Sequence, residues 1–500
     1  MTMSCDRFFL CLVTICSGLL ISCNDNTLEK SVRDAVKDGV VTSEEWQSIV
    51  TSAQEDDLFV NEDGEVDCGQ LRDYVTNFAL HKMRGIEEVT FPELAQDSTT
   101  EASSTPIKIK FFLERSGSMI PYDSPKTRGD FKAAITQLIN NTPQSDSDSN
   151  KLFVVNSAVF PYDKSLKSFI QSKDIFRDTK GLGDPRYTDF TCIFDSILTQ
   201  TRANELSILA SDLIYSTTET GIVNPEKINN EARSLTTSVF KNHSDKDVLV
   251  VKLLSDFDGT YYPYTSPNKG FHYSGDRPYY LVMSSEPGVM RRVFLDKEYA
   301  AFSDIERLKG FEDYYCFTRY NAKPYYSVLL SHKDNKGRFG AAKGSGTTIH
   351  SITNVKPDRD GETCITLAVD LSQIIISKED KEDEDMYEIK SLSGFKIDDI
   401  SEIEQEDRTP AMERYAPHAT HLIVLKSEEA IKNETITISY KNQLPEWVGE
   451  TNTDDDTDAG AEDFSETTFA FSHLMQGIFD AFFPSGSETS LFTITLDIKK

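Results

Sequence analysis

The sequence predicts a multidomain protein of the mixed α/β class, built from a small helical pair, a doubly wound α/β domain and a mostly β, sandwich-like domain. Three observations support this prediction. A short repeat with helical spacing lies within residues 23–96. Strands then alternate with helices over residues 106–300, as in parallel doubly wound sheets. Short strands rich in β-branched residues follow over residues 301–500, with no long helices between most of them.

Composition limits the classes of function. The chain has 500 residues, enough for about two to four domains. Its 82 acidic residues outnumber its 52 basic residues and give a formal net charge of −30. Such a charge repels phosphate backbones, so nucleic acid is excluded as an expected partner. Divalent cations and basic protein surfaces are the expected counter-charges.

The N-terminus predicts export. The apolar run Phe8–Ile21 follows Arg7 and is too short to span a bilayer, which takes about 20 residues, so residues 1–22 are predicted to be a signal peptide. The run ends in Leu20-Ile21-Ser22-Cys23, which resembles the bacterial lipobox. That resemblance implies lipidation of Cys23 and anchoring in the bacterial cell envelope, and Asn24 favours the outer membrane. A plain secretory signal cleaved elsewhere is the alternative.

The remaining cysteines do not indicate a metal site. They are widely spaced and form no CxxC pair, which argues against zinc. Outside the cytoplasm they are free to form disulfides or to remain as buried thiols. These residues are Cys68, Cys192, Cys316 and Cys364.

The repeat within residues 23–96 resembles the second half of an EF-hand. Asp38-Gly39-Val40-Val41 and Asp63-Gly64-Glu65-Val66 each precede apolar residues at helical spacing. Those apolar residues are Trp46, Ile49 and Val50 in the first copy and Leu71, Tyr74 and Val75 in the second.

The calcium ligands of this repeat are incomplete. Glu45 stands where the first loop would place its bidentate carboxylate, but Val36 occupies the third position. The second loop has Phe59 first and Gln70 last. Because affinity follows ligand charge and number, a structural helical pair is expected, with calcium binding as the alternative. Residues 97–105 then read as a linker.

Residues 106–300 predict a doubly wound domain. The first strand, Ile107–Leu113, runs directly into Glu114. Helices are expected around residues 131–139, 193–198 and 228–240 and after Pro287, and further strands at Leu152–Phe160, Leu206–Ala210, Val248–Leu254 and Tyr279–Met283. Such sheets bind ligands at the carboxyl ends of their strands, which is where Glu114 and Asp212 stand.

The segment Glu114-Arg115-Ser116-Gly117-Ser118, with Asp212 after a later strand, resembles the metal-ion-dependent adhesion site of von Willebrand factor type A domains. The resemblance implies that Ser116 and Ser118 bind the ion directly, whereas Glu114 and Asp212 bind it largely through water. Hydroxyl and carboxylate oxygens suit Mg²⁺ or Mn²⁺, with Ca²⁺ as an alternative. One coordination position would stay open for a carboxylate of a protein partner.

A threonine is the remaining ligand that the resemblance implies. Thr188 and Thr191 both precede the helix expected around residues 193–198, and Thr188 is preferred. Two residues depart from the family pattern. Glu114 replaces an Asp and adds one carbon–carbon bond, about 1.5 Å. Leu213 replaces a frequent Gly, so a weakened or empty site is the alternative.

Residues 301–500 predict a β-sandwich. Its strands are expected at Tyr325–Leu330, Thr363–Leu371, Thr420–Leu425, Thr435–Tyr440 and Leu491–Ile498. Lys378–Asp385 and Asn452–Asp458 are expected as solvated acidic loops, with a calcium loop as the alternative for the latter. The apolar stripe from Phe471 to Phe482 is expected to pack against the sandwich. His418 and His421 would point to opposite faces of a strand, which disfavours a shared metal.

The sequence contains no recognised catalytic motif: no Gly-x-Ser-x-Gly elbow, no P-loop and no His-Glu-x-x-His. A non-enzymatic, lipid-anchored protein that binds a partner in adhesion or envelope assembly is therefore expected. An envelope hydrolase or processing factor, or a scaffold with an inert site, are the alternatives.

Overall fold

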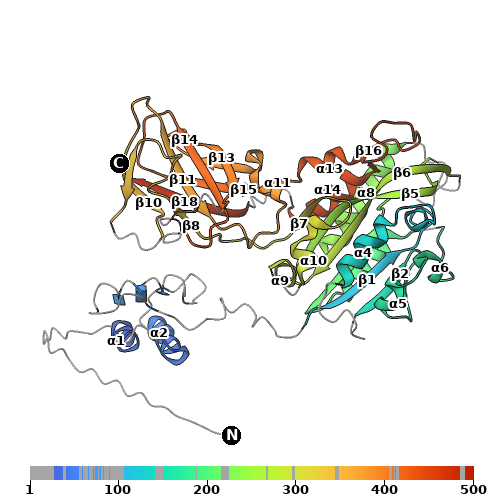
Figure 1. Ribbon diagram of the computed structural model, residues 1–500, viewed down its shortest axis with the longest axis horizontal. Coiled ribbons are helices and arrows are strands. Elements are labelled where there is room, and N and C mark those ends of the chain that lie inside the picture. Colours follow the sequence, from blue (N-terminus) through green and yellow to red (C-terminus); the bar gives the residue numbers. More distant parts are fainter. Residues whose placement is uncertain are drawn as a thin grey trace, which may run out of the picture. The chain divides into compact units, whose positions relative to one another are not determined.

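The computed structural model divides into two compact units, Met1–Ser103 and Ser104–Lys500 (Figure 1). In the first unit it describes residues 27–37 and 41–55 and scattered positions from 59 to 89. In the second it describes residues 106–499 except 141–149, 187, 216–223, 266–268, 296–298, 344–347, 405–407, 410–411, 413–415 and 485–489. Cys23, Cys68, the linker 97–105, residues 38–40 of the first EF-hand-like loop and all of the second loop except Phe59 and Val66 lie outside the described residues.

The first unit is helical, with α1 at Thr27–Ala35 and α2 at Ser43–Glu55. Trp46 and Ile49 on α2 share one buried apolar cluster with Leu71 and Val75, which confirms the predicted helical spacing in both copies of the repeat. Glu45 caps its own helix: its carboxylate accepts hydrogen bonds from the Thr42 backbone N–H at 2.9 Å and hydroxyl at 2.8 Å.

The second unit begins with a seven-stranded mixed sheet in the order β3-β2-β1-β4-β6-β5-β7. Strand β1 pairs in parallel with β2 and β4, and the other pairs are antiparallel. The bounds are β1 Lys108–Glu114, β2 Lys151–Val155, β3 Val159–Pro161, β4 Glu205–Ser211, β5 Asp247–Tyr261, β6 Phe271–Ser285 and β7 Phe311–Phe317.

The prediction of a parallel sheet holds only for β2, β1 and β4, and the single strand predicted at Leu152–Phe160 is instead the antiparallel pair β2 and β3. Strands β5 and β6 are each 15 residues long and form one continuous antiparallel hairpin. The connection at residues 262–270 is too short for the helical crossover that parallel neighbours need. Strand β7 also extends the sheet beyond the predicted end at residue 300.

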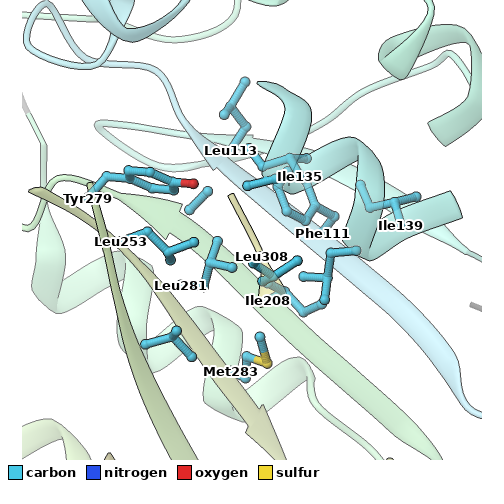
Figure 2. Packing of buried hydrophobic residues seen from close by; sticks show 14 of the residues in the cluster. Phe111, Leu113, Ile135, Ile139, Ile208, Leu253, Tyr279, Leu281, Met283 and Leu308 are labelled. Carbon is cyan, nitrogen blue, oxygen red and sulfur yellow. The ribbon is translucent and has the colours of Figure 1, made fainter. Parts of the chain in front are cut away.

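Helices cover both faces of this sheet. Alternate side chains of a buried strand point to opposite faces, and here the two sets enter different apolar clusters. Phe111 and Leu113 pack in one cluster with Ile135 of α4 (Figure 2), whereas Phe112 packs in the other with α7 and α8. The helices are α4 Asp130–Asn140, α5 Leu166–Ile170, α6 Ile175–Asp178, α7 Phe190–Gln200, α8 Pro225–Lys241, α9 Val289–Leu295 and α10 Ala300–Ser303, with 3₁₀ turns η1 Ile120–Asp123 and η3 Ile305–Arg307.

A β-sandwich follows, as predicted. Its two sheets have the orders β12-β15-β18-β10-β9 and β13-β14-β11-β8, and side chains of both form one core. The bounds are β8 Tyr326–Val328, β9 Arg338–Ala341, β10 Ser351–Lys356, β11 Thr363–Val369, β12 Tyr387–Lys390, β13 Lys396–Glu402, β14 His421–Ser427, β15 Glu434–Lys441 and β18 Ser490–Lys499. Between β11 and β12 lie α11 Lys378–Glu382 and η4 Glu384–Met386.

Helix α14, Phe471–Phe482, packs on α8 of the α/β domain, so the prediction that its apolar stripe packs against the sandwich is wrong. Gly477 allows the close approach, since a Cβ there would lie 2.3 Å from the Arg233 carbonyl oxygen. The Thr236 hydroxyl donates to the Leu474 carbonyl at 3.0 Å, and Arg233 pairs with Asp480 at 2.6 Å.

The chain therefore leaves the sandwich after β15 and returns to it with β18. Between them lie α13 Glu446–Glu450, the short strands β16 Asn452–Thr453 and β17 Thr468–Phe469, and α14. Within the described parts of the chain, no helix is long and apolar enough to cross a membrane. Cys192, Cys316 and Cys364 are free thiols.

Candidate metal centre

The ends of two neighbouring parallel strands bring the predicted acids together. Leu113 of β1 lies in register with Ala210 of β4, so Glu114 and Asp212 leave the sheet at the same edge. Glu114 is only 2% exposed and Asp212 only 1%. Thr188, just before α7, is buried beside them.

Two hydroxyl groups hold the Glu114 carboxylate. The Thr188 hydroxyl donates to Oε1 at 2.8 Å, and the Ser211 hydroxyl donates to Oε2. Thr191 is exposed on α7 and lines a separate open depression. The structure thus places Thr188, and not Thr191, against the first acid. A serine at a strand end carries no sequence signal of its own, and Ser211 was not predicted.

Ser116 and Ser118 lie in the turn that follows β1. Their hydroxyl oxygens are 3.0 Å apart, and the Met119 N–H donates to Ser116 Oγ at 3.2 Å. The turn is anchored because the Gly117 N–H donates to the Pro185 carbonyl at 3.0 Å. Gly117 also lies against the Tyr262 ring, where a Cβ would be 3.1 Å from Cε2.

Asn156 links this turn to the segment that carries Thr188. Its side-chain amide donates to the Arg115 carbonyl at 3.4 Å and to the Leu182 carbonyl at 3.0 Å, and Asn156 is completely buried. Neither Asn156 nor Tyr262 was predicted, because the chain places both far from the serine motif. Both residues position the turn.

The two buried acids form no ion pair within the described part of the chain. Asp212 Oδ1 accepts the Ile214 N–H at 3.1 Å, but Oδ2 has no hydrogen-bond partner among the residues that the structure describes. Among the described residues, no Lys or Arg forms an ion pair with either carboxylate. Burial first, and then the neighbouring Asp212, raises the pKa of Glu114 to about 8. Burial likewise raises the pKa of Asp212, and hydrogen bonding from Ser118 and the charge of Arg277 oppose this rise.

Leu213 follows the second acid, Asp212, at the position where the family pattern frequently has glycine. Its φ of 50° lies in the left-handed region, where glycine is least strained. The Leu213 N–H donates to Ser211 Oγ at 2.9 Å, and its side chain is buried in an apolar cluster. Hydrogen bonding and apolar burial together hold leucine in this conformation.

The donor set fits a hard divalent cation. Each hydroxyl that donates its proton to a carboxylate keeps oxygen lone pairs for an ion, and Asp212 Oδ2 is an unused anionic oxygen. No group of three or more His, Cys, Asp or Glu with metal-binding geometry occurs among the residues that the structure describes. A cation here would therefore depend on serine and threonine as well as on the acids.

A second buried polar centre lies between the β5–β6 hairpin and the acidic segment. Within Asn452–Asp458, Asp454 and Asp455 are exposed as predicted, but Asp456 is buried. Asp456 accepts hydrogen bonds from the Tyr261 hydroxyl at 2.8 Å and from the Tyr264 N–H at 3.0 Å. The acidic segment is thus attached to the α/β domain, and Tyr261 is one of the residues that hold it there.

No family model, curated protein or solved structure matches this chain. The interpretation of the centre therefore depends on its own geometry and chemistry.

Proposed function

We propose that this chain is a lipid-anchored, extracytoplasmic protein of the bacterial cell envelope that binds a protein partner through a divalent cation in a type A-like domain. The residues that would hold the cation are Glu114, Ser116, Ser118, Thr188 and Asp212. Mg²⁺ or Mn²⁺ is the proposed ion, with Ca²⁺ as the alternative. The helical pair, whose EF-hand-like character is part of the same proposal, would act as a spacer after the lipidated Cys23.

The observation that carries this proposal is the unpartnered Oδ2 of Asp212 beside Glu114. Two buried carboxylates with no cation in contact are costly to ionise together. A divalent ion removes that cost, and the hydroxyl groups around it are neutral donors that add no further repulsion. Burial raises the pKa of both acids, which is consistent with a need for a counter-charge at this centre.

The surroundings of the centre support partner binding. When bound, the cation would offer an open coordination position to a carboxylate from outside. Ser118 is half-buried, and Ile120, two residues further along the turn, is 40% exposed. An exposed apolar side chain next to a charged centre gives a partner an apolar contact beside its carboxylate.

Metal titration tests this proposal. We expect Mg²⁺ or Mn²⁺ to release or absorb heat and to raise the Tm of EDTA-treated protein. The double variant Ser116→Ala with Asp212→Ala should lose both effects. Thr188→Ala should weaken binding by about tenfold, whereas Thr191→Ala is the matched control and should bind as the wild type does.

The outcome separates binding from an inert scaffold. If saturating Mg²⁺, Mn²⁺ and Ca²⁺ gave neither heat nor a shift in Tm with the wild-type chain, the proposal would fail. With binding established, a bead-immobilised chain should retain an envelope protein in Mn²⁺ and release it in EDTA. Retention by the double variant would contradict a role for the centre.

A further inference from the structure

A pocket of about 330 Å³ lies in the second unit, away from the candidate metal centre. It is lined by the start of β14, by α11 and by the turn around η3. The Lys378 backbone N–H donates to Glu306 Oε1 at 3.3 Å and so ties α11 to that turn. The apolar part of the wall consists of Phe294, Tyr314, Ile374 and Ile375.

His421 presents a ring nitrogen, Nε2, that has no hydrogen-bond partner among the described residues at this pocket. The Thr420 hydroxyl oxygen accepts the Leu371 N–H at 2.9 Å and keeps its own proton to donate. His421 Nδ1, at 2.8 Å, is a nearer acceptor than the Val369 carbonyl at 3.5 Å. In the tautomer in which the Thr420 hydroxyl donates to Nδ1, the ring proton lies on Nε2.

In that tautomer the Nε2–H lacks an acceptor. His421 is only 6% exposed, and its Nε2 has no hydrogen-bond partner within the described ranges of the chain. Burial, followed by the charge of Lys381, lowers the pKa of His421 to about 4, so the ring is neutral at pH 7. A buried N–H with no acceptor is costly, and a ligand oxygen would remove that cost.

Lys381 is a second donor in the same wall. Its ammonium group has no ion-pair partner among the described residues, and burial lowers its pKa. Three acids line the same pocket, and the charges of Glu306 and Glu402 oppose the effect of burial on the pKa of Lys381. Asp304 pairs with Arg307 at 3.4 Å, Glu402 pairs with Lys378 at 2.5 Å, and Glu306 accepts the Lys378 N–H.

We propose that this pocket binds a small organic acid. Its carboxylate would accept hydrogen bonds from His421 Nε2–H and from the Lys381 ammonium. Its hydrocarbon part would lie against the apolar wall formed by Phe294, Tyr314, Ile374 and Ile375. The proposal is independent of the metal centre, because no residue is shared between the two sites.

Calorimetry and ligand-observed saturation-transfer NMR on the full chain test this proposal. The probes are isovalerate and benzoate, with the uncharged isovaleramide and benzamide as matched ligands. We expect the carboxylates to bind and the amides to bind at least about tenfold more weakly, as for loss of a charged hydrogen bond. Failure of both carboxylates to bind at about 10 mM would overturn the proposal, as would equal affinity for the amides.

Variants locate the site. Lys381→Met and His421→Leu should each weaken carboxylate binding by about tenfold or more, whereas His421→Gln, which keeps an N–H donor, should retain affinity within about threefold. His418→Gln and Lys396→Met alter exposed residues outside the pocket and should bind as the wild type does. Thermal unfolding without ligand identifies variants that fold. Unchanged affinity in folded Lys381→Met and His421→Leu would contradict the assignment.

Discussion

At the scale of single residues, Asp456 shows how one buried carboxylate connects distant parts of the chain. Its two oxygens accept hydrogen bonds from Tyr261 and Tyr264, which lie at the end of β5 and just beyond it. Arg277 lies on β6, and its guanidinium carbon is 4.7 Å from the centroid of the Tyr261 ring and 4.3 Å from the centroid of the Phe464 ring. The acidic segment is thereby fixed to the hairpin.

Asp456 has a predictable effect on the pH dependence of stability. Burial raises its pKa to about 6 from an ordinary value of 3.8. The folded state therefore holds this proton more tightly than the unfolded state, and its stabilising effect is present at low pH and is lost as pH rises from about 4 to about 6.

Urea unfolding at pH 4, 5, 6 and 7 measures this effect. The free energy of unfolding of Asp456→Asn relative to wild type should rise by about 2 to 3 kcal/mol across this range. The exposed Asp455→Asn is the matched control and should show no such trend. A pH-independent difference for Asp456→Asn would contradict the prediction.

The sequence predicts the proposed ligands of the metal centre better than it predicts the residues that position them. The pattern of a strand followed by a polar turn was enough to place Glu114 and Asp212 at one edge, because parallel neighbours end together. Ser211, Asn156 and Tyr262 could not be predicted. Their roles depend on which loops meet in space, and a single Ser, Asn or Tyr in a loop has no characteristic pattern.

At the scale of elements, the contact between α8 and α14 depends on a helical glycine. A Cβ on Gly477 would lie 2.0 Å from Thr236 Oγ1 and 2.3 Å from the Arg233 carbonyl oxygen. Apolar periodicity correctly predicted helix α14 and its buried face. It could not identify the neighbouring helix, because an apolar stripe fits any apolar surface of similar width.

Gly477→Ala should therefore destabilise the protein despite the higher helix propensity of alanine. We expect a loss of about 1 to 3 kcal/mol through overpacking, measured by urea unfolding. Gly449→Ala on α13 is the matched control, since a Cβ there meets no atom within 4 Å. It should be neutral or slightly stabilising. Equal effects of the two substitutions would contradict close packing at Gly477.

The β5–β6 hairpin marks a limit of prediction for strands. The buried stretches Val248–Leu254 and Tyr279–Met283 were recognised because they are apolar. Their extensions contain Asp, Gly and Tyr, which resemble loop sequence, yet the cross-strand ladder continues to Tyr261 and Phe271. Pairing of the two extensions with each other supplies stability that neither segment shows alone.

At the scale of the whole molecule, the α/β domain and the sandwich share the last part of the chain. Helix α14 completes an apolar cluster of the α/β domain, and β18 lies between β15 and β10 in the middle of a sandwich sheet. Removing residues 442–500 would expose Ile436 and Ile438 of β15 and leave one side of that strand without its hydrogen-bonding partner.

A chain that ends at Lys441 should therefore lose stable structure in both domains. We expect limited proteolysis to cut it throughout residues 106–441 at protease levels that leave the full chain intact. Far-ultraviolet circular dichroism should show a broad unfolding transition at lower temperature. A protected α/β fragment from the shortened chain would contradict this dependence.

The central position of β18 also bears on how the polypeptide is made. During synthesis from the N-terminus, the other strands of the sandwich emerge well before residue 499. Strand β15 therefore has an unpaired edge until β18 has been made. Such edges pair readily with other chains. Until β18 has been made, the side of β15 that it covers is therefore open to pairing with another chain.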